Sequence, residues 1–245
     1  MFWYDILNEN IEKSDKDIAS SQKIFFEISK NLLNTKLLKI NENIEIELTE
    51  VEFYFFDCLN HPDTFVHIDE LQKTTNYLYV HKQAWSRGGI DITFGNDKYF
   101  GGILIRGIKY KDSYISGSAT IKKYISNLID NSINNYKSLQ DYFEKNKKTI
   151  SLIENENKNM KVLHSTRVGL KSINNPKFAN ALYRFIREDY LDEIDKSKFA
   201  SYNNLKERTK IKAISSLTLD YLTNEKSAIE DIKNNSFLYN NIKSF

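Results

Sequence analysis

Several sequence patterns are missing from this 245-residue chain, and each absence excludes a class of protein. The chain has a single cysteine, Cys58, so it forms no intrachain disulfide and lacks most thiolate metal sites. No run approaches the ~18 consecutive apolar residues of a transmembrane helix. The amino terminus lacks the basic and then apolar stretches of a secretory signal. We therefore expect a cytoplasmic protein with no membrane partner.

A strong excess of one charge is missing as well. The chain carries 35 Lys and Arg against 33 Asp and Glu, which gives a formal net charge of +2. Proteins that coat nucleic acid carry a much larger basic excess. A nucleic-acid partner is therefore compatible with this sequence only if basic side chains gather on one face.

Apolar and aromatic residues are abundant by contrast. Hydrophobic residues make up 40% of the chain, which contains 15 Phe and 15 Tyr. A chain of this composition can form a sizeable core, so global disorder is excluded. The length suits one large domain or a domain with a short appendage.

Apolar periodicity predicts a strand-rich centre between helical ends. Ile24, Phe25, Ile28 and Leu32 form one apolar stripe, which indicates a helix over 19–34. Extended structure is expected over 36–56, with a turn at 41–43, and strands at 76–81, 90–94 and 102–110. Helices are expected over 118–130, 135–147, 177–187 and much of 200–232. The connecting segments are expected to be loops over 57–75 and 154–161, a turn at 85–89 and a short strand or turn at 168–170. The expected fold class is α+β.

The strand expected after the turn at 41–43 changes its apolar face partway along. Apolar residues occupy the even positions 44, 46 and 48, and then the odd positions 51, 53 and 55. Side chains alternate across a strand, so such a change has two explanations. Either a bulge rotates the strand and leaves Glu50 and Glu52 solvated, or the two carboxylates enter a face that was apolar just before. In the second case one glutamate lies at the rim of a pocket.

Three of the four histidines, His61, His67 and His81, fall within 21 residues. A metal site needs three or four ligands that converge at ~2 Å. The spacing of these histidines matches none of the short zinc motifs, so they are either loop histidines that form hydrogen bonds or ligands of a metal-dependent hydrolase. Cys58 lacks the flanking residues typical of cysteine proteases.

A glutamate with aromatic neighbours is the remaining candidate for chemistry. Glu52 lies in the same part of the chain as Tyr54, Tyr77, Tyr79 and Trp85. A flat, electron-poor ring can stack between such side chains while the glutamate activates a water molecule beside it. Such a pocket suits a nucleobase. The alternative is that these residues are ordinary core aromatics on strands.

Short blocks in a fixed order strengthen the first of these interpretations. They are Phe25-Phe26 with residues 32–38, Thr49-Glu50-Val51-Glu52-Phe53-Tyr54 with Asp63-Thr64-Phe65-Val66-His67, Tyr77-Leu78-Tyr79-Val80-His81, residues 101–108 with Arg106, and Arg167-Val168-Gly169-Leu170 with Leu182-Tyr183-Arg184-Phe185. Together these blocks resemble the motifs of the alkyladenine (3-methyladenine) DNA glycosylase family, in the order in which the family has them. The resemblance covers roughly residues 24–190.

The resemblance implies a role for each matching residue. Residues 49–54 are similar to the family's Glu-Thr-Glu-Ala-Tyr motif, so Glu52 is expected to be the catalytic base and Tyr54 a platform for the flipped base. The other residues expected to bind the base are His67, Tyr79 and His81. The residues expected to contact DNA are Trp85, Arg106, Arg167 and Arg184.

Several positions depart from the family pattern. His81 replaces the second pocket tyrosine, and Trp85 lies where the family has the tyrosine that wedges into DNA. The pocket asparagine has no clear counterpart, with Asp91 and Thr93 as the nearest polar residues. The family's Gly-Pro-Gly segment is also missing, and residues 191–245 lie outside the resemblance.

The resemblance implies a glycosylase-like domain over 1–190, with a curved, mostly antiparallel sheet flanked by helices, and a helical extension over 191–245 packed on it. The implied activity is excision of an alkylated or deaminated purine from double-stranded DNA, without a metal or cofactor, by a monomer. The alternatives are a non-catalytic nucleic-acid binder with the same fold and a metal-dependent hydrolase that uses the histidines.

Overall fold

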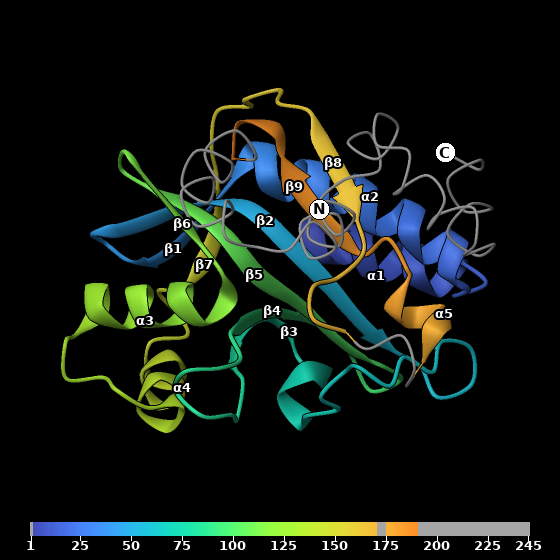
Figure 1. Cartoon of the computed structure of the whole chain (residues 1–245), viewed down its shortest axis with the longest axis horizontal. Coiled ribbons are helices and arrows are strands. Elements are labelled where there is room, and N and C mark those ends of the chain that lie inside the picture. Colours follow the sequence, from blue (N-terminus) through green and yellow to red (C-terminus); the bar gives the residue numbers. More distant parts are fainter. Residues whose placement is uncertain (1, 171–174, 191–245) are drawn as a thin grey trace, which may run out of the picture.

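An antiparallel sheet runs through the computed structural model, which describes residues 2–170 and 175–190 (Figure 1). The strands are β1 (Lys36–Asn41), β2 (Ile44–Phe56), β3 (Thr75–Val80), β4 (Ile90–Phe94), β5 (Phe100–Tyr110), β6 (Ser113–Ser116), β7 (Ser151–Glu154), β8 (Val162–Ser165) and β9 (Arg184–Arg187). The helices are α1 (Trp3–Lys13), α2 (Ile18–Thr35), α3 (Ser118–Ile129), α4 (Tyr136–Lys145), α5 (Pro176–Ala179) and the short 3₁₀ helix η1 (Glu70–Lys73). The predicted α+β class is confirmed.

The sheet has the strand order β3-β4-β5-β2-β1-β7, with β6 beside β5 and the pair β8-β9 beside β2. The sheet curls into half a barrel, and helices α1 and α2 lie together on one of its faces (Figure 1). Helix α3 contacts β5, and helix α4 contacts β3 (Figure 1). Among the described residues, no helix combines the length and the apolar character needed to cross a bilayer.

Strand β2 is the centre of the sheet because it pairs with β5 along one edge and with β1 and then β9 along the other. The register between β2 and β5 shifts on both sides of Glu50, so the bulge predicted from the alternation is present. The glutamates are nevertheless buried, Glu50 with 2% and Glu52 with 0% of its surface exposed. The bulge therefore directs two carboxylates into the protein, and neither is solvated.

Helix α2 supplies the apolar layer behind β2. The helix begins after Asp17, whose side chain accepts a hydrogen bond from the backbone N–H of Ser20. On its buried stripe, Phe25 stacks on Phe53 of β2 with ring centroids 4.5 Å apart. This packing presses one face of β2 onto the core and leaves the face that carries Glu52 to the candidate site.

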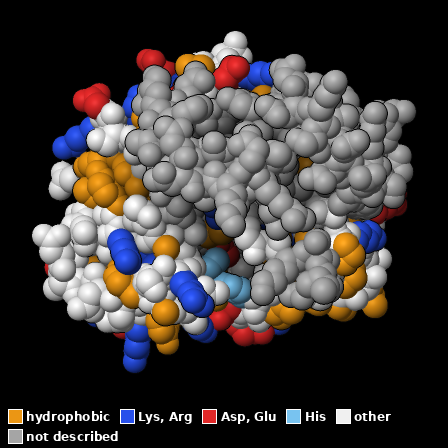
Figure 2. All heavy atoms as spheres, viewed as in Figure 1, with side chains coloured by type: hydrophobic (Ala, Val, Ile, Leu, Met, Phe, Trp, Pro, Cys, Tyr) orange, Lys and Arg blue, Asp and Glu red, His pale blue; other side chains and the backbone are white. Residues whose placement is uncertain are grey.

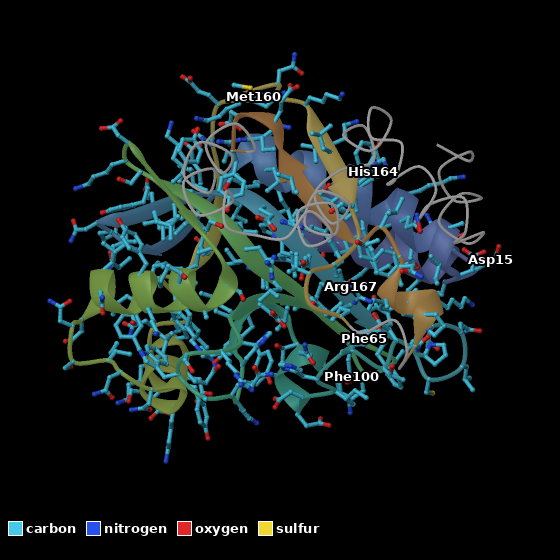
Figure 3. The ribbon with its side chains drawn as sticks, viewed as in Figure 1. Asp15, Phe65, Phe100, Met160, His164 and Arg167 are labelled. Atoms are coloured by element: carbon cyan, nitrogen blue, oxygen red, sulfur yellow. The ribbon has the colours of Figure 1, made fainter. Side chains whose placement is uncertain are left out.

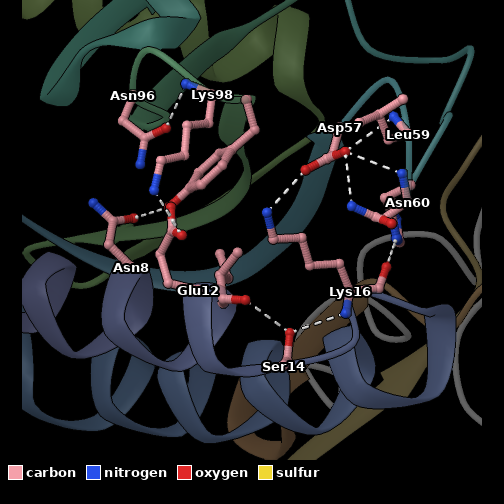
Figure 4. A network of polar contacts seen from close by, with 12 residues as sticks. Asn8, Glu12, Ser14, Lys16, Asp57, Leu59, Asn60, Asn96 and Lys98 are labelled. Atoms are coloured by element: carbon pink, nitrogen blue, oxygen red, sulfur yellow. Dashed lines mark hydrogen bonds and ion pairs between the residues drawn. The ribbon is translucent and has the colours of Figure 1, made fainter.

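The connection between α1 and α2 is fastened to the end of β2 by polar contacts (Figure 4). The ammonium of Lys16 lies 2.9 Å from Asp57, and both side chains are largely buried. Asp57 also accepts hydrogen bonds from the backbone N–H groups of Leu59 and Asn60. These contacts fix the loop that follows β2.

Most predicted elements of the described residues are confirmed to within two residues, including α2, α3, α4 and strands β1 to β5. The helix predicted over 177–187 is wrong, because only the short α5 forms there and is followed by β9. Strand β9 pairs with both β2 and β8, and these partners override the local pattern. Residues 168–170 begin in a turn. The helices predicted within 191–245 lie outside the described residues.

Candidate active site

A cavity of about 310 Å³ opens beside β2, close to the glutamate predicted to be catalytic. This volume lies at the lower end of the ~300–1,000 Å³ range of small-molecule sites. The cavity is lined by Tyr54, Phe65, His67, Gln72, His81, Gln83, Gly88, Asp91, Leu104, Arg106, Ser118, Val168, Gly169 and Leu170. Five segments that are distant in sequence therefore meet there: β2, the region from 65 to 91, β5, the start of α3 at Ser118 and the turn at 168–170.

Glu52 lies directly behind the wall of this cavity. Its Oε1 accepts a hydrogen bond from the backbone N–H of Val168 at 2.7 Å and lies 3.2 Å from Nε of Arg106. Its Oε2 accepts a hydrogen bond from the hydroxyl of Tyr54 at 3.0 Å. These three partners belong to residues that line the cavity, and Glu52 itself is fully buried behind them.

The hydrogen-bonding capacity of Glu52 is not exhausted by these contacts. An ionised carboxylate has about four acceptor positions. The described residues give Glu52 two hydrogen bonds and an ion pair with Arg106, whose Nε–H is donated to Glu50. Hydrogen bonds fill two of these positions, so the carboxylate retains acceptor capacity.

Two carboxylates and two guanidiniums form a charged cluster beneath the site. Glu50 Oε1 accepts hydrogen bonds from Nε of Arg184 at 2.6 Å and from Nε of Arg106 at 3.0 Å. Burial raises the pKa of Glu50, but Arg184 and Arg106 outweigh it and lower the pKa below its usual value. Burial lowers the pKa of Arg106, but Glu52 and Glu50 outweigh it and raise that pKa. Arg106 thus stays charged between the two glutamates.

Tyr54 remains a hydrogen-bond donor in this environment. Burial, and then the negative charge of Glu52, raise the pKa of its phenol well above the usual value. The guanidinium carbon of Arg167 lies 4.6 Å from the centre of its ring. One face of Tyr54 is therefore occupied by a cation, while its hydroxyl is held on Glu52.

Two histidines and a buried aspartate form another part of the cavity wall. The rings of His67 and His81 lie edge to face with centroids 4.2 Å apart. Nε2 of His81 lies 2.7 Å from Oδ1 of Asp91, and Gln72 donates a hydrogen bond to the other oxygen of Asp91 at 3.1 Å. His67 is the more exposed histidine, and histidine side chains reach the surface on the face seen in Figure 2.

The structure brings together four of the residues predicted for this site. Tyr54, His67 and His81 line the cavity, and Glu52 contacts its wall. Tyr79 is buried and does not line the cavity, and its hydroxyl lies 3.3 Å from Nδ1 of His67. Tyr79 therefore supports a histidine and offers no face to a ligand in this structure.

Trp85 lies in the loop between β3 and β4, which also contributes Gln83 and Gly88 to the cavity. Its ring is partly buried against the core, and the ammonium of Lys122 lies 4.8 Å from the ring centre. Trp85, the residue predicted to wedge into DNA, thus belongs to a loop that lines the cavity, but its ring packs against the core.

The arginines predicted to contact DNA have carboxylate partners inside the protein. Arg167 is paired with Asp63 at 2.7 Å, and neither side chain has exposed surface. Arg184 is buried against Glu50, and Arg106 lies between Glu50 and Glu52. The prediction that these three arginines hold phosphates is therefore corrected, because their guanidiniums are bound to the protein's own carboxylates.

Figure 3 shows Arg167 beside Phe65, which lines the cavity. The fourth histidine, His164, lies on β8. The guanidinium carbon of Arg167 is 5.7 Å from the centre of the Phe65 ring. Arg167 thus contributes to the site by holding Phe65 and Tyr54 in place.

His61 is separated from the other two clustered histidines by its contacts. Its Nδ1 lies 2.7 Å from the backbone oxygen of Lys16, and its ring packs against Phe178 and Tyr183. Within residues 2–170 and 175–190, no three His, Cys, Asp or Glu side chains are placed to hold a metal ion. The described residues therefore do not support a metal-dependent hydrolase that uses the three histidines.

The sequence reasoning did not predict Gln72 or the backbone N–H of Val168 as parts of the site. Gln72 lies in η1, within a segment read as a loop, and its partner Asp91 is 19 residues away. Only the position of Val168 in the Arg-Val-Gly-Leu block pointed toward the site, and a backbone donor has no side-chain signature.

No protein-family model matches the chain, and no curated protein matches it in sequence.

Proposed function

We propose that the protein is a monofunctional DNA glycosylase that removes an alkylated or deaminated purine from duplex DNA. The observation that carries this proposal is the placement of Glu52, a buried carboxylate held by two hydrogen bonds and an ion pair from the wall of a cavity of about 310 Å³. A base inside a duplex cannot reach such a cavity, so the nucleotide must first leave the stack. Flipping costs a few kcal/mol, and least for a damaged or mispaired base.

The cavity wall supplies planar groups on which a flipped ring can rest. Four of the residues that line the cavity have planar side chains: Tyr54, Phe65, His67 and His81. Stacking on aromatic side chains is worth ~1–3 kcal/mol per base and tolerates several ring types. A damaged purine held in this way exposes its glycosidic bond to the wall that contains Glu52.

Glu52 then acts on a water molecule at its remaining acceptor position. It takes a proton from the water, and the oxygen attacks C1′ of the sugar as the glycosidic bond breaks. The negative carboxylate also stabilises the positive charge that develops at C1′. Tyr54, Arg106 and the N–H of Val168 fix the orientation of the carboxylate during this step.

Contacts to the DNA backbone fall to basic residues other than the three buried arginines. Lys82 and Arg87 lie in the exposed part of the loop that supplies Gln83 and Gly88 to the cavity. Lys and Arg side chains also occur on the face in Figure 2 where histidines reach the surface. Phosphate contacts from such side chains position a duplex without reading its sequence.

The test is to incubate the protein with methylated and with deaminated duplex DNA and to measure free bases by mass spectrometry. The wild type is expected to release a purine, and Glu52→Gln is expected to release none while keeping the far-ultraviolet circular dichroism of the wild type. Glu45→Gln, an exposed substitution on the same strand, is the matched control and is expected to retain activity. Equal release by Glu52→Gln and the wild type would end the catalytic assignment.

The complete burial of Glu52 favours a second candidate, a non-catalytic nucleic-acid binder with the same pocket, because a buried carboxylate without access for water performs no hydrolysis. A duplex-binding titration at increasing salt distinguishes the two. Tight, salt-dependent binding without release of any base supports the binder.

A further inference from the structure

His81 and Asp91 form a hydrogen-bonded pair in the cavity wall that the action of Glu52 on water does not use. Both residues line the cavity, and their side chains are 9% and 2% exposed. The pair joins β4 to the end of β3, so two neighbouring strands fix its position. A buried polar pair of this kind at a pocket calls for a functional explanation.

The geometry around Asp91 is built to hold this carboxylate. Gln72 donates to one of its oxygens at 3.1 Å, and Nε2 of His81 lies 2.7 Å from the other. Gly102 on β5 leaves room for it, because a Cβ atom at position 102 would lie 2.5 Å from Oδ2 of Asp91. Asp91 is therefore confined to one orientation, and so is the imidazole bonded to it.

The second ring nitrogen of His81 is left for a ligand. Nε2 is committed to Asp91, whereas Nδ1 forms no hydrogen bond with any residue that the structure describes. A carboxylate on one nitrogen orients an imidazole and stabilises positive charge on the ring, so that the other nitrogen can give a proton to a bound group. In this cavity the bound group is the flipped base.

We propose that His81 is the general acid that protonates the departing base and that Asp91 is the residue that positions His81. This inference rests on the proposed glycosylase function and assigns the residue that makes excision of its neutral, deaminated purines possible. A purine such as hypoxanthine leaves as an unstable anion unless a ring nitrogen is protonated. An N7-methylated purine already carries a positive charge and leaves as a neutral molecule without an acid.

The reaction balances with water as the co-reactant. The glycosidic bond breaks and its electron pair passes to the base, while the proton on Nδ1 of His81 passes to a ring nitrogen of that base. Glu52 takes one proton from water, and the hydroxide oxygen bonds to C1′. The proton on Glu52 returns to His81 through solvent after the products leave, so both side chains regain their starting states.

The experiment compares two lesions in otherwise identical duplexes, one containing hypoxanthine and the other N7-methylguanine. Single-turnover rates of base release are measured for the wild type, His81→Gln and Asp91→Asn. The control is His164→Gln, the same substitution at a histidine on β8 that lies outside the cavity lining. The wild type is expected to release both bases.

The inference predicts that His81→Gln lowers the rate for hypoxanthine at least ~10²-fold, the usual contribution of a general acid, and leaves the rate for N7-methylguanine nearly unchanged. Asp91→Asn is expected to have the same selectivity with a smaller loss. The N7-methylguanine rate also reports whether each variant is folded. Equal loss on both lesions, or no loss on either, would overturn the acid role of His81 and leave the proposed function standing. A wild type that releases neither base would overturn both.

Discussion

Neutralising Asp63 tests whether Arg167 belongs to the protein interior. The two side chains have no exposed surface and lie 2.7 Å apart. The guanidinium also donates to the backbone oxygens of Phe178 at 2.9 Å and Phe53 at 3.3 Å. In Asp63→Asn the amide oxygen still accepts from the backbone N–H of Phe65, so the substitution keeps the side-chain shape while it removes the charge and the acceptor of the Arg167 hydrogen bond.

The expected loss of stability is large. Removing one partner of a buried ion pair leaves a buried charge without compensation and costs ~3–5 kcal/mol. Total unfolding free energies of domains are ~5–15 kcal/mol, so the loss is a substantial share. With a denaturant dependence of ~2 kcal/mol per molar urea, the unfolding midpoint should fall by about 1.5–2.5 M.

Urea unfolding followed by tryptophan fluorescence measures this change. The control is Asp141→Asn, an exposed aspartate on α4, which should shift the midpoint by less than about 0.5 M because exposed charges contribute ~0–1 kcal/mol. The double variant Asp63→Asn/Arg167→Met should recover part of the loss, since it removes the orphaned charge. A midpoint for Asp63→Asn equal to that of Asp141→Asn would refute the buried pair and return Arg167 to the candidates for DNA contact.

Three further predictions follow from single groups. Burial lowers the pKa of His61 to about 4, so the unfolded chain binds an extra proton between pH 6.5 and 4. The unfolding free energy should therefore fall by roughly 3 kcal/mol as the pH drops through this range. His61→Gln should lose that pH dependence, which urea titrations at each pH would measure. Tyr54→Phe removes a donor to Glu52 and should slow base release without moving the thermal midpoint by more than a few degrees. Gly102→Ala places a methyl group against Asp91 and should lower stability by ~1–3 kcal/mol, measured by urea unfolding, and slow hypoxanthine release more than N7-methylguanine release.

Helices α2, α3 and α4 and strands β1 to β5 were predictable because they depend on local patterns, whereas α1, β6, β7 and β8 were not predicted. The change of apolar face between positions 48 and 51 located the bulge of β2. The helix predicted over 177–187 was wrong because Leu182, Phe185 and Ile186 fit either a helix or a strand. Only the partners β2 and β8 decide between the two, and no local pattern reveals them.

The partners of the arginines were not predictable from sequence for the same reason. Asp63 and Arg167 are 104 positions apart in the chain, and Glu50 and Arg184 are 134 apart. An arginine in a motif has the chemistry to bind either a phosphate or a carboxylate, and only the fold shows that a carboxylate is nearer. The candidate base and its neighbours were easier, since Glu52 and Tyr54 lie two residues apart on one strand.

The single-turnover rate of base release from a duplex that contains one damaged purine tests the central claim most directly. The measurement compares wild-type protein with Glu52→Gln at saturating enzyme concentration. Our account predicts release by the wild type and a loss of at least ~10²-fold in the variant, with duplex binding retained. Equal rates for the two proteins, or no release of any damaged purine by the wild type, would contradict it.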